Sequence, residues 1–304
     1  MIFPLWVEGL GTRRWPYVTT ALIVINFVVF LGTHEQIENE SRKTADIELP
    51  MLLIAAAHPE VQPPREVKPL IDSFAQENKA LWEGVRSGKQ PPLSAWDSEM
   101  RDWGPLEASR EMAKLADQLK AVEQDSLLKN YAFYPYHPAL LSLITANFLH
   151  GGWLHLIFNM WFLWLAGTMM EDVWWPVVYT CVYLLFGAAA LLAHGYTYPH
   201  SSLPVLGASG AIAGLIGAFL IRFPEVKIDL IFIFFRIIRF AWPAIFVLLL
   251  WLLVQIFWGS LMRTSGGVAY WAHIGGFIFG ALIAIAFRQM GIERPIVEPA
   301  EILS

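Results

Sequence analysis

Residues 207–221 read Gly-Ala-Ser-Gly-Ala-Ile-Ala-Gly-Leu-Ile-Gly-Ala-Phe-Leu-Ile, an uncharged apolar run that carries one serine, Ser209. A second apolar run, residues 268–287, carries His273 within Ala-His-Ile-Gly-Gly. Polar side chains cost free energy inside a bilayer, so a polar residue in a spanning segment is by default a functional candidate. Ser209 and His273 are therefore the first candidates for a site.

The composition predicts a multi-pass membrane protein, because 56% of the 304 residues are hydrophobic and only 15% are charged. The single cysteine, Cys181, lies in an apolar segment, which excludes a disulfide framework and a cysteine metal cluster. The metalloprotease motif His-Glu-x-x-His does not occur in the sequence. We expect no metal, no cofactor and no nucleic-acid partner.

Six apolar runs predict six transmembrane helices in an all-α membrane protein. The runs are residues 17–31, 153–170, 173–193, 208–221, 240–262 and 268–287. The first and fourth are shorter than the roughly 20 residues that a span usually needs, so flanking residues must add length or the bilayer must thin there. No small-x-small cleavage site follows the first run, which predicts a signal anchor rather than a signal peptide.

Basic residues in the short flanks predict that both termini face the cytoplasm. In a six-helix topology the following residues share one side: Arg13, Arg14, Arg222, Lys227, Arg236, Arg239, Arg288 and Arg294. Among the short segments on the other side, only Arg263 is basic. The acidic pair Glu171-Asp172 also falls on the inner side, but acidic residues contribute little to this rule.

Residues 33–137 form a soluble insert that holds 12 of the 21 basic and 18 of the 26 acidic residues. Long loops translocate largely regardless of charge, so we expect this insert on the outer face. Pro63-Pro64 and Pro91-Pro92 divide it into segments. Apolar residues recur at helical spacing between residues 105 and 129, which predicts a small packed bundle or a surface helix rather than a catalytic element. These residues are Leu106, Met112, Leu115, Leu119, Val122 and Leu127.

Counting along the helices, at about 1.5 Å per residue, brings three polar residues to one depth. Ser209 stands 13 residues before Arg222, or about 20 Å above the inner boundary. His273 stands 15 residues before Arg288, or about 22 Å, and His155 stands 16 residues before the acidic loop, or about 24 Å. A chance arrangement would scatter these residues over different depths.

The polar residues at this depth form a chemically coherent set. Ser209 is the candidate nucleophile and His273 its general base. The Ser209 amide lies in the first turn of its helix, where N–H groups lack intrahelical partners, and His155 and Asn159 are spaced i, i+4 on one helical face. All three are candidate donors to an oxyanion. No acidic residue lies at this depth, so we predict a Ser-His dyad.

Each feature taken alone has a structural explanation. Gly210-x-x-x-Gly214 and Gly276-x-x-x-Gly280 are patterns of close helix packing, and Ser209 alone is explained by such packing. Isolated histidine and asparagine side chains also hydrogen-bond neighbouring helices. The joint pattern of the three helices favours a site.

Three motifs resemble those of rhomboid intramembrane serine proteases of the bacterial six-helix type. They are His150-x4-His155-x3-Asn159, Gly207-Ala208-Ser209-Gly210 and Ala272-His273-x2-Gly276-x3-Gly280. The resemblance implies a six-helix rhomboid bundle with Ser209 as nucleophile, His273 as base, and His155, Asn159 and the Ser209 amide around the oxyanion. It also implies structural roles for His150, Gly207, Gly210, Gly276 and Gly280.

The sequence departs from the best-known pattern of this family. Leu141 and Ser142 stand where many members carry a Trp-Arg pair, and Ala213 stands where some members carry a tyrosine four residues after the nucleophile. Tyr270 and Trp271 are candidates for an aromatic neighbour of His273 instead.

The resemblance divides the chain into four parts and implies its function. Residues 1–32 are a cytoplasmic N-terminus and first helix, 33–137 the insert, 138–288 the catalytic core with helices 2–6, and 289–304 a cytoplasmic tail. We expect a bacterial inner-membrane endopeptidase that cuts peptide bonds in or near the transmembrane segments of membrane-protein substrates in the lipid bilayer. The alternative is a catalytically silent relative that binds membrane helices for quality control. A transporter or channel is disfavoured because the spans hold almost no charged residues.

Overall fold

The computed structural model describes residues 2–7, 14–87, 100–233, 237–262 and 268–294. Several residues used above lie outside these ranges: Arg13, Pro91-Pro92, Arg236, Arg263 and residues 295–304 of the expected tail.

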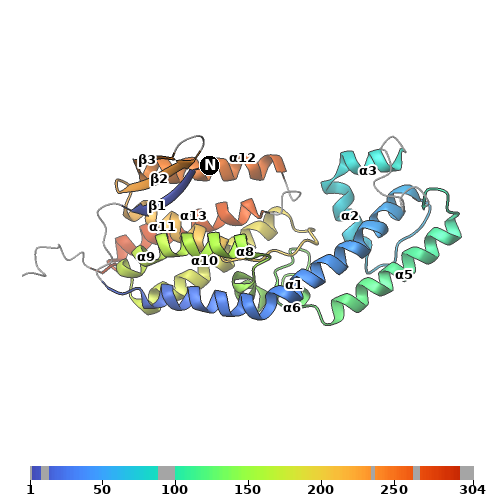
Figure 1. Ribbon diagram of the computed structural model, residues 1–304, viewed down its shortest axis with the longest axis horizontal. Helices are drawn as coiled ribbons and strands as arrows, with labels where there is room; N and C mark the ends of the chain where they lie inside the picture. The colour runs from blue at the N-terminus through green and yellow to red at the C-terminus, as the bar shows by residue number, and fades with distance from the viewer. Residues whose placement is uncertain (1, 8–13, 88–99, 234–236, 263–267, 295–304) are drawn as a thin grey trace, which may run out of the picture.

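The described residues form the expected helical membrane bundle (Figure 1). Its apolar helices are α1 (Tyr17–Ala57), the continuous run α8 (Trp153–Phe162), η2 (Leu163–Gly167) and α9 (Thr168–Val173), α10 (Pro176–Thr197), α11 (Ser209–Arg222), α12 (Ala244–Met262) and α13 (Tyr270–Met290). Within the described ranges, five spans are long and apolar enough to cross a membrane, and α11, with 14 residues, is shorter. The short fourth span is therefore confirmed.

Helix α11 lies at the centre of the bundle, with α10 and α13 packed against it. Its backbone approaches that of α13 so closely that a Cβ added at Gly280 would overlap the backbone oxygen of Gly214, and one at Gly276 would overlap that of Gly210. A Cβ at Gly217 would likewise overlap the backbone oxygen of Phe277. Small residues thus permit direct backbone contact between the helices that carry Ser209 and His273.

Helix α1 is longer than the expected span. It continues for 41 residues, past Leu31, and its second half lies in the part of the chain that the sequence assigned to the insert. The helix crosses that assigned boundary without a break, because polar residues such as Glu, Lys and Gln favour helix as well as leucine does. Figure 1 shows α1 running from the membrane helices to the insert helices at the other end of the molecule.

The insert is a small packed bundle, which agrees with the helical spacing in its sequence. It contains the end of α1, α2 (Lys68–Glu77), α3 (Lys79–Arg86), α5 (Pro105–Gln124) and α6 (Leu127–Tyr131). Met112, Leu115 and Leu119 of α5 are buried in its core with apolar residues of α1 such as Met51 and Ile54. Leu106 differs from the others, since it is exposed.

The insert is tied to the segment that precedes Ser209. Phe133 forms a two-way backbone bridge with Val205. The Tyr136 amide donates to the Ser201 carbonyl, and the hydroxyls of Ser73 and Ser202 lie 3.1 Å apart. These contacts fix the position of the chain that leads into α11.

A three-stranded antiparallel sheet, which the sequence did not predict, accompanies the bundle. It consists of β1 (Ile2–Val7), β2 (Lys227–Ile233) and β3 (Ile237–Pro243), in the order β1-β2-β3. Strand β3 extends to Pro243, so the helix that we expected to begin at Phe240 begins at Ala244. Proline suits the end of a strand but not the interior of a helix.

The ends of several helices meet at the end of the bundle where α1 begins. The buried carboxylate of Glu171 accepts hydrogen bonds from the amides of Val18 and Thr19 in the first turn of α1, at 2.8 and 2.7 Å. The Arg222 Nε lies 2.9 Å from a carboxylate oxygen of Glu293. Glu171 thus complements the free amides and positive dipole of a helix N-terminus, which explains an acidic residue on the basic side.

The close contact between α11 and α13 predicts that one added methyl group at this interface lowers the stability of the protein. Gly280→Ala places a Cβ against the Gly214 oxygen, and overpacking of this kind costs roughly 1–3 kcal/mol. We expect a lower midpoint of thermal unfolding in detergent. The control is Gly32→Ala in α1, where nothing lies within 4 Å of the added Cβ, and alanine gains about 0.5–1 kcal/mol over glycine within a helix. Equal stability of Gly280→Ala and wild type would contradict the close approach.

The insert carries a pH-sensitive carboxylate. Burial and, secondarily, the charge of Glu123 raise the pKa of Glu48 on α1 from 4.5 to about 7. A raised pKa means that the protonated form stabilises the fold, and this contribution is present below about pH 4.5 and is lost as the pH rises through 7. Glu48→Gln should therefore protect the insert amides from hydrogen exchange, relative to wild type, at pH 8 but not at pH 4. An advantage that shrinks as the pH rises would contradict this assignment.

Candidate active site

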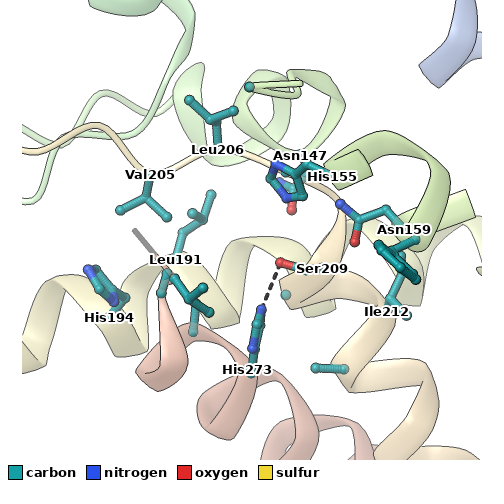
Figure 2. A pocket seen from close by; sticks show the side chains of 18 of the residues that line it. Asn147, His155, Asn159, Leu191, His194, Val205, Leu206, Ser209, Ile212 and His273 are labelled. Carbon is teal, nitrogen blue, oxygen red and sulfur yellow. Dashed lines mark hydrogen bonds between the residues drawn. The ribbon is translucent and has the colours of Figure 1, made fainter. Parts of the chain in front are cut away.

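Ser209 and His273 are in contact. Ser209 is the first residue of α11, His273 lies in the first turn of α13, and the His273 Nε2 is 2.8 Å from the Ser209 Oγ (Figure 2). Residue counting placed the two side chains at the same depth, and the backbone contact between α11 and α13 brings them together there. The pair has the geometry that a serine nucleophile and its base require.

Two potential donors lie on the other side of Ser209. Figure 2 shows His155 and Asn159, one helical turn apart on α8, across Ser209 from His273. Asn159 is 6% exposed, and its Nδ2 has no hydrogen-bond partner among the described residues. The Ser209 amide, in the first turn of α11, lacks an intrahelical partner. A buried N–H donor without a partner is suited to a charge that appears only during a reaction.

Gly207 brings the backbone against His155. Its φ of 118° is a conformation that favours glycine, and a Cβ there would lie 2.7 Å from the His155 ring. Its amide donates to the Ala146 carbonyl at 2.8 Å. Both features place the turn before Ser209 beside the ring of His155.

The fully buried His150 contacts its own loop. Its Nδ1 lies 3.3 Å from the Phe148 carbonyl oxygen, and its ring packs edge-on against His155 with centroids 5.1 Å apart. The contacts are of the kind expected for a structural residue in the segment before α8.

The loop before α8 is held without a Trp-Arg pair. At the expected positions, Leu141 is exposed and Ser142 bonds the Ala139 carbonyl. The buried Asn147 donates to the Leu143 carbonyl and packs its amide on Gly187 of α10, where a Cβ would overlap it. The contact between the Asn147 side chain and the Gly187 backbone thus joins this segment to the bundle.

Two residues of α12 contact His273, and the sequence analysis identified neither. The Oε1 of Gln255 lies 2.8 Å from the His273 Nδ1. The Trp251 ring, one turn earlier, lies 6.1 Å from the His273 ring, tilted by 31°. The expectation of Tyr270 or Trp271 is corrected in favour of Trp251, since the Trp271 indole N–H donates to the Gly259 carbonyl. Gln255 is a polar residue within an apolar run, and that signal could have revealed it.

A cavity of about 900 Å³ opens over these residues. Ser209, His273, His155 and Asn159 line it together with the segment from Leu203 to Gly207. The volume is within the range of ligand sites in proteins. It can hold a short stretch of polypeptide and water next to the Ser209 hydroxyl.

Comparisons with known proteins agree with this geometry. A family model described as "Rhomboid domain" matches residues 137–290. Rhomboid protein 1, mitochondrial, of Saccharomyces cerevisiae is 32% identical over 152 residues, which cover 48% of this chain and 42% of that protein. Rhomboid-like protease 5 of Toxoplasma gondii is 26% identical over 226 residues, 70% of this chain and 25% of that protein. Rhomboid protease GluP of Bacillus subtilis is 38% identical over 78 residues, 26% of this chain and 15% of that protein.

The chain spans less than half the length of each of these relatives. The family match nevertheless covers half of this chain and includes all the residues that line the cavity. The apolar helices, the three motifs and the match together show that this integral membrane protein belongs to the rhomboid family.

Proposed function

We propose that the protein is an intramembrane serine endopeptidase that uses Ser209 and His273 as a catalytic dyad. The observation that carries the proposal is the 2.8 Å contact between the Ser209 Oγ and the His273 Nε2, at the wall of a cavity large enough for a peptide. The names of relatives such as Rhomboid protease GluP support the same reaction class.

In the proposed reaction, the Ser209 Oγ attacks the carbonyl carbon of the substrate peptide bond as its proton passes to the His273 Nε2. The carbonyl oxygen becomes an oxyanion that accepts hydrogen bonds from the Asn159 Nδ2, His155 and the Ser209 amide. When the C–N bond breaks, His273 returns the proton to the leaving amine, and the acyl group remains on Ser209. Water then attacks the ester in the reverse sequence and releases the new carboxyl end.

The proposed substrates are membrane proteins with a spanning helix that unwinds near the site. An intact helix hides its carbonyl groups in internal hydrogen bonds, so a peptide bond must be exposed before it reaches Ser209. The estimated depth of Ser209, about 20 Å above the inner boundary, is closer to the outer face. The outer location of the insert, the cytoplasmic termini and a bacterial inner membrane stay predictions.

The alternative function is a catalytically silent family member that binds membrane helices. It shares the bundle and the cavity with the protease, but it does not need a serine within hydrogen-bonding distance of a histidine. The unpartnered Asn159 Nδ2 next to that pair favours the protease.

Removal of either dyad residue should abolish cleavage. Ser209→Ala and His273→Ala should each lower kcat by at least about 10³-fold, because nucleophile and base act as one unit. The assay follows cleavage of a membrane-anchored reporter in liposomes. Ser87→Ala and His200→Ala, at exposed positions that do not line the cavity, are the matched controls. Cleavage at the wild-type rate by either dyad variant would exclude this assignment, and a wild type that binds but does not cut would favour the silent relative.

Loss of an oxyanion donor should affect the rate more than substrate binding. Asn159→Ala should lower kcat by roughly 10²–10³-fold with little change in KM. Asn159→Asp is the sharper test, because it conserves size and replaces the N–H donor with an oxygen that repels an oxyanion. We expect Asn159→Asp to be at least as slow as Asn159→Ala. A kcat near the wild-type value for Asn159→Asp would remove Asn159 from the oxyanion site.

A further inference from the structure

Gln255 is a buried polar side chain in the middle of an apolar helix. The sequence of α12 is Ala-Ile-Phe-Val-Leu-Leu-Leu-Trp-Leu-Leu-Val-Gln-Ile-Phe-Trp-Gly-Ser-Leu-Met, in which only Gln255 and Ser260 carry a hydrogen-bonding amide or hydroxyl. Gln255 is 9% exposed, and its Oε1 lies 2.8 Å from the His273 Nδ1. A buried amide in a spanning helix needs a partner, and this one has the imidazole of the proposed base.

With the Gln255 Oε1 facing the ring, the contact favours one tautomer of His273. An amide oxygen accepts hydrogen bonds and does not donate them, so Nδ1 must be the N–H donor in this pair. In a neutral imidazole the other nitrogen, Nε2, then carries a lone pair. This is the nitrogen that lies 2.8 Å from the Ser209 Oγ. A ring with its proton on Nε2 instead could not accept the Ser209 proton.

The same helix also restricts the plane of the ring. Trp251 lies one turn before Gln255, and its ring packs at 6.1 Å from the His273 ring. The hydrogen bond to Gln255 opposes rotation of the imidazole, and the neighbouring Trp251 ring opposes its tilting. Both contacts come from α12. Only 17% of the apolar window of α12 is buried, the smallest share among the candidate spans of the described residues. The few residues that α12 does bury include the one that bonds His273.

We infer that Gln255 is a positioning residue that holds His273 in the tautomer and orientation needed to accept the Ser209 proton. The role is the one that a carboxylate performs in a Ser-His-Asp triad, here performed by a neutral amide that adds no charge to the membrane interior. The inference rests on the proposed function. The alternative is a purely structural role, in which Gln255 only joins α12 to α13 by an interhelical hydrogen bond.

The test uses two replacements of similar size in the full-length protein in liposomes. Gln255→Met keeps the length and apolar stem of the side chain but removes the amide oxygen. Gln255→Glu keeps an oxygen acceptor at the same distance. We expect Gln255→Met to lower kcat by roughly 10–10³-fold at an unchanged KM and Gln255→Glu to retain most of the activity, because a wrong tautomer weakens the base and not substrate binding. Ser260→Ala, an exposed polar position on the same helix, should behave as wild type.

The second measurement does not depend on cleavage. Nitrogen chemical shifts of ¹⁵N-labelled histidine, assigned to His273 by comparison with His273→Ala, report which ring nitrogen is protonated. Wild type and Ser209→Ala should show protonation at Nδ1, and Gln255→Met should show a gain of the form protonated at Nε2. His155 and His194 also line the cavity and are assigned in the same way.

The outcomes separate the inference from the proposed function. Gln255→Met with an unchanged tautomer, or with a raised KM and lower thermal stability at unchanged kcat, overturns the positioning role and leaves helix fastening. Cleavage that persists in Ser209→Ala overturns the proposed function, and the tautomer of His273 still decides the inference. A shifted tautomer together with a lower kcat and rescue by Gln255→Glu supports it.

Discussion

The backbone contact between α11 and α13 is the constraint on which the rest of the site depends. Helices with ordinary side chains at their interface keep their axes about 8–10 Å apart, whereas here the glycines of one helix meet the carbonyl oxygens of the other. A hydrogen bond between Ser209 and His273 loses its strength within a few tenths of an ångström. Packing and chemistry therefore use the same residues, and the glycine patterns are an argument for the site as well as for the fold.

Some of the polar groups inside this bundle are paired, and others are not. Glu171 satisfies the first amides of α1, and Gln255 bonds His273. Other buried polar atoms of the described residues have no protein partner, among them the Asn159 Nδ2, the Trp174 Nε1 and the His194 Nδ1. An unpaired donor costs stability of the order of 1–3 kcal/mol. Asn159 differs from the other two in that its side chain lies beside Ser209 (Figure 2), where the proposed reaction would supply the missing partner.

The sequence predicts the helices well, and it predicts that Ser209 and His273 lie at a common level, because both depend on local spacing. Residue counting gave Ser209 and His273 nearly the same level, and the two side chains are in contact. The contact of Gln255 with His273 could not be predicted in this way, since the two residues are 18 positions apart and lie on different helices. The sheet was missed for a similar reason, because β1 pairs with a strand more than 220 residues later in the chain. The continuity of α1 was missed because a change from apolar to charged residues marks a change of solvent and not the end of a helix.

The uninterrupted α1 has a mechanical consequence. A helix of 41 residues is about 60 Å long, and it is fixed at one end by Glu171 and at the other by the core of the insert. Glu40, near its middle, also caps α6, which leads directly to the bridge between Phe133 and Val205. The insert is therefore connected to the membrane helices by a continuous helix and by side-chain and backbone contacts, and not by a flexible linker. A displacement of the insert would thus reach the segment before Ser209 along two connected routes, through α1 and through α6 with the Phe133–Val205 bridge.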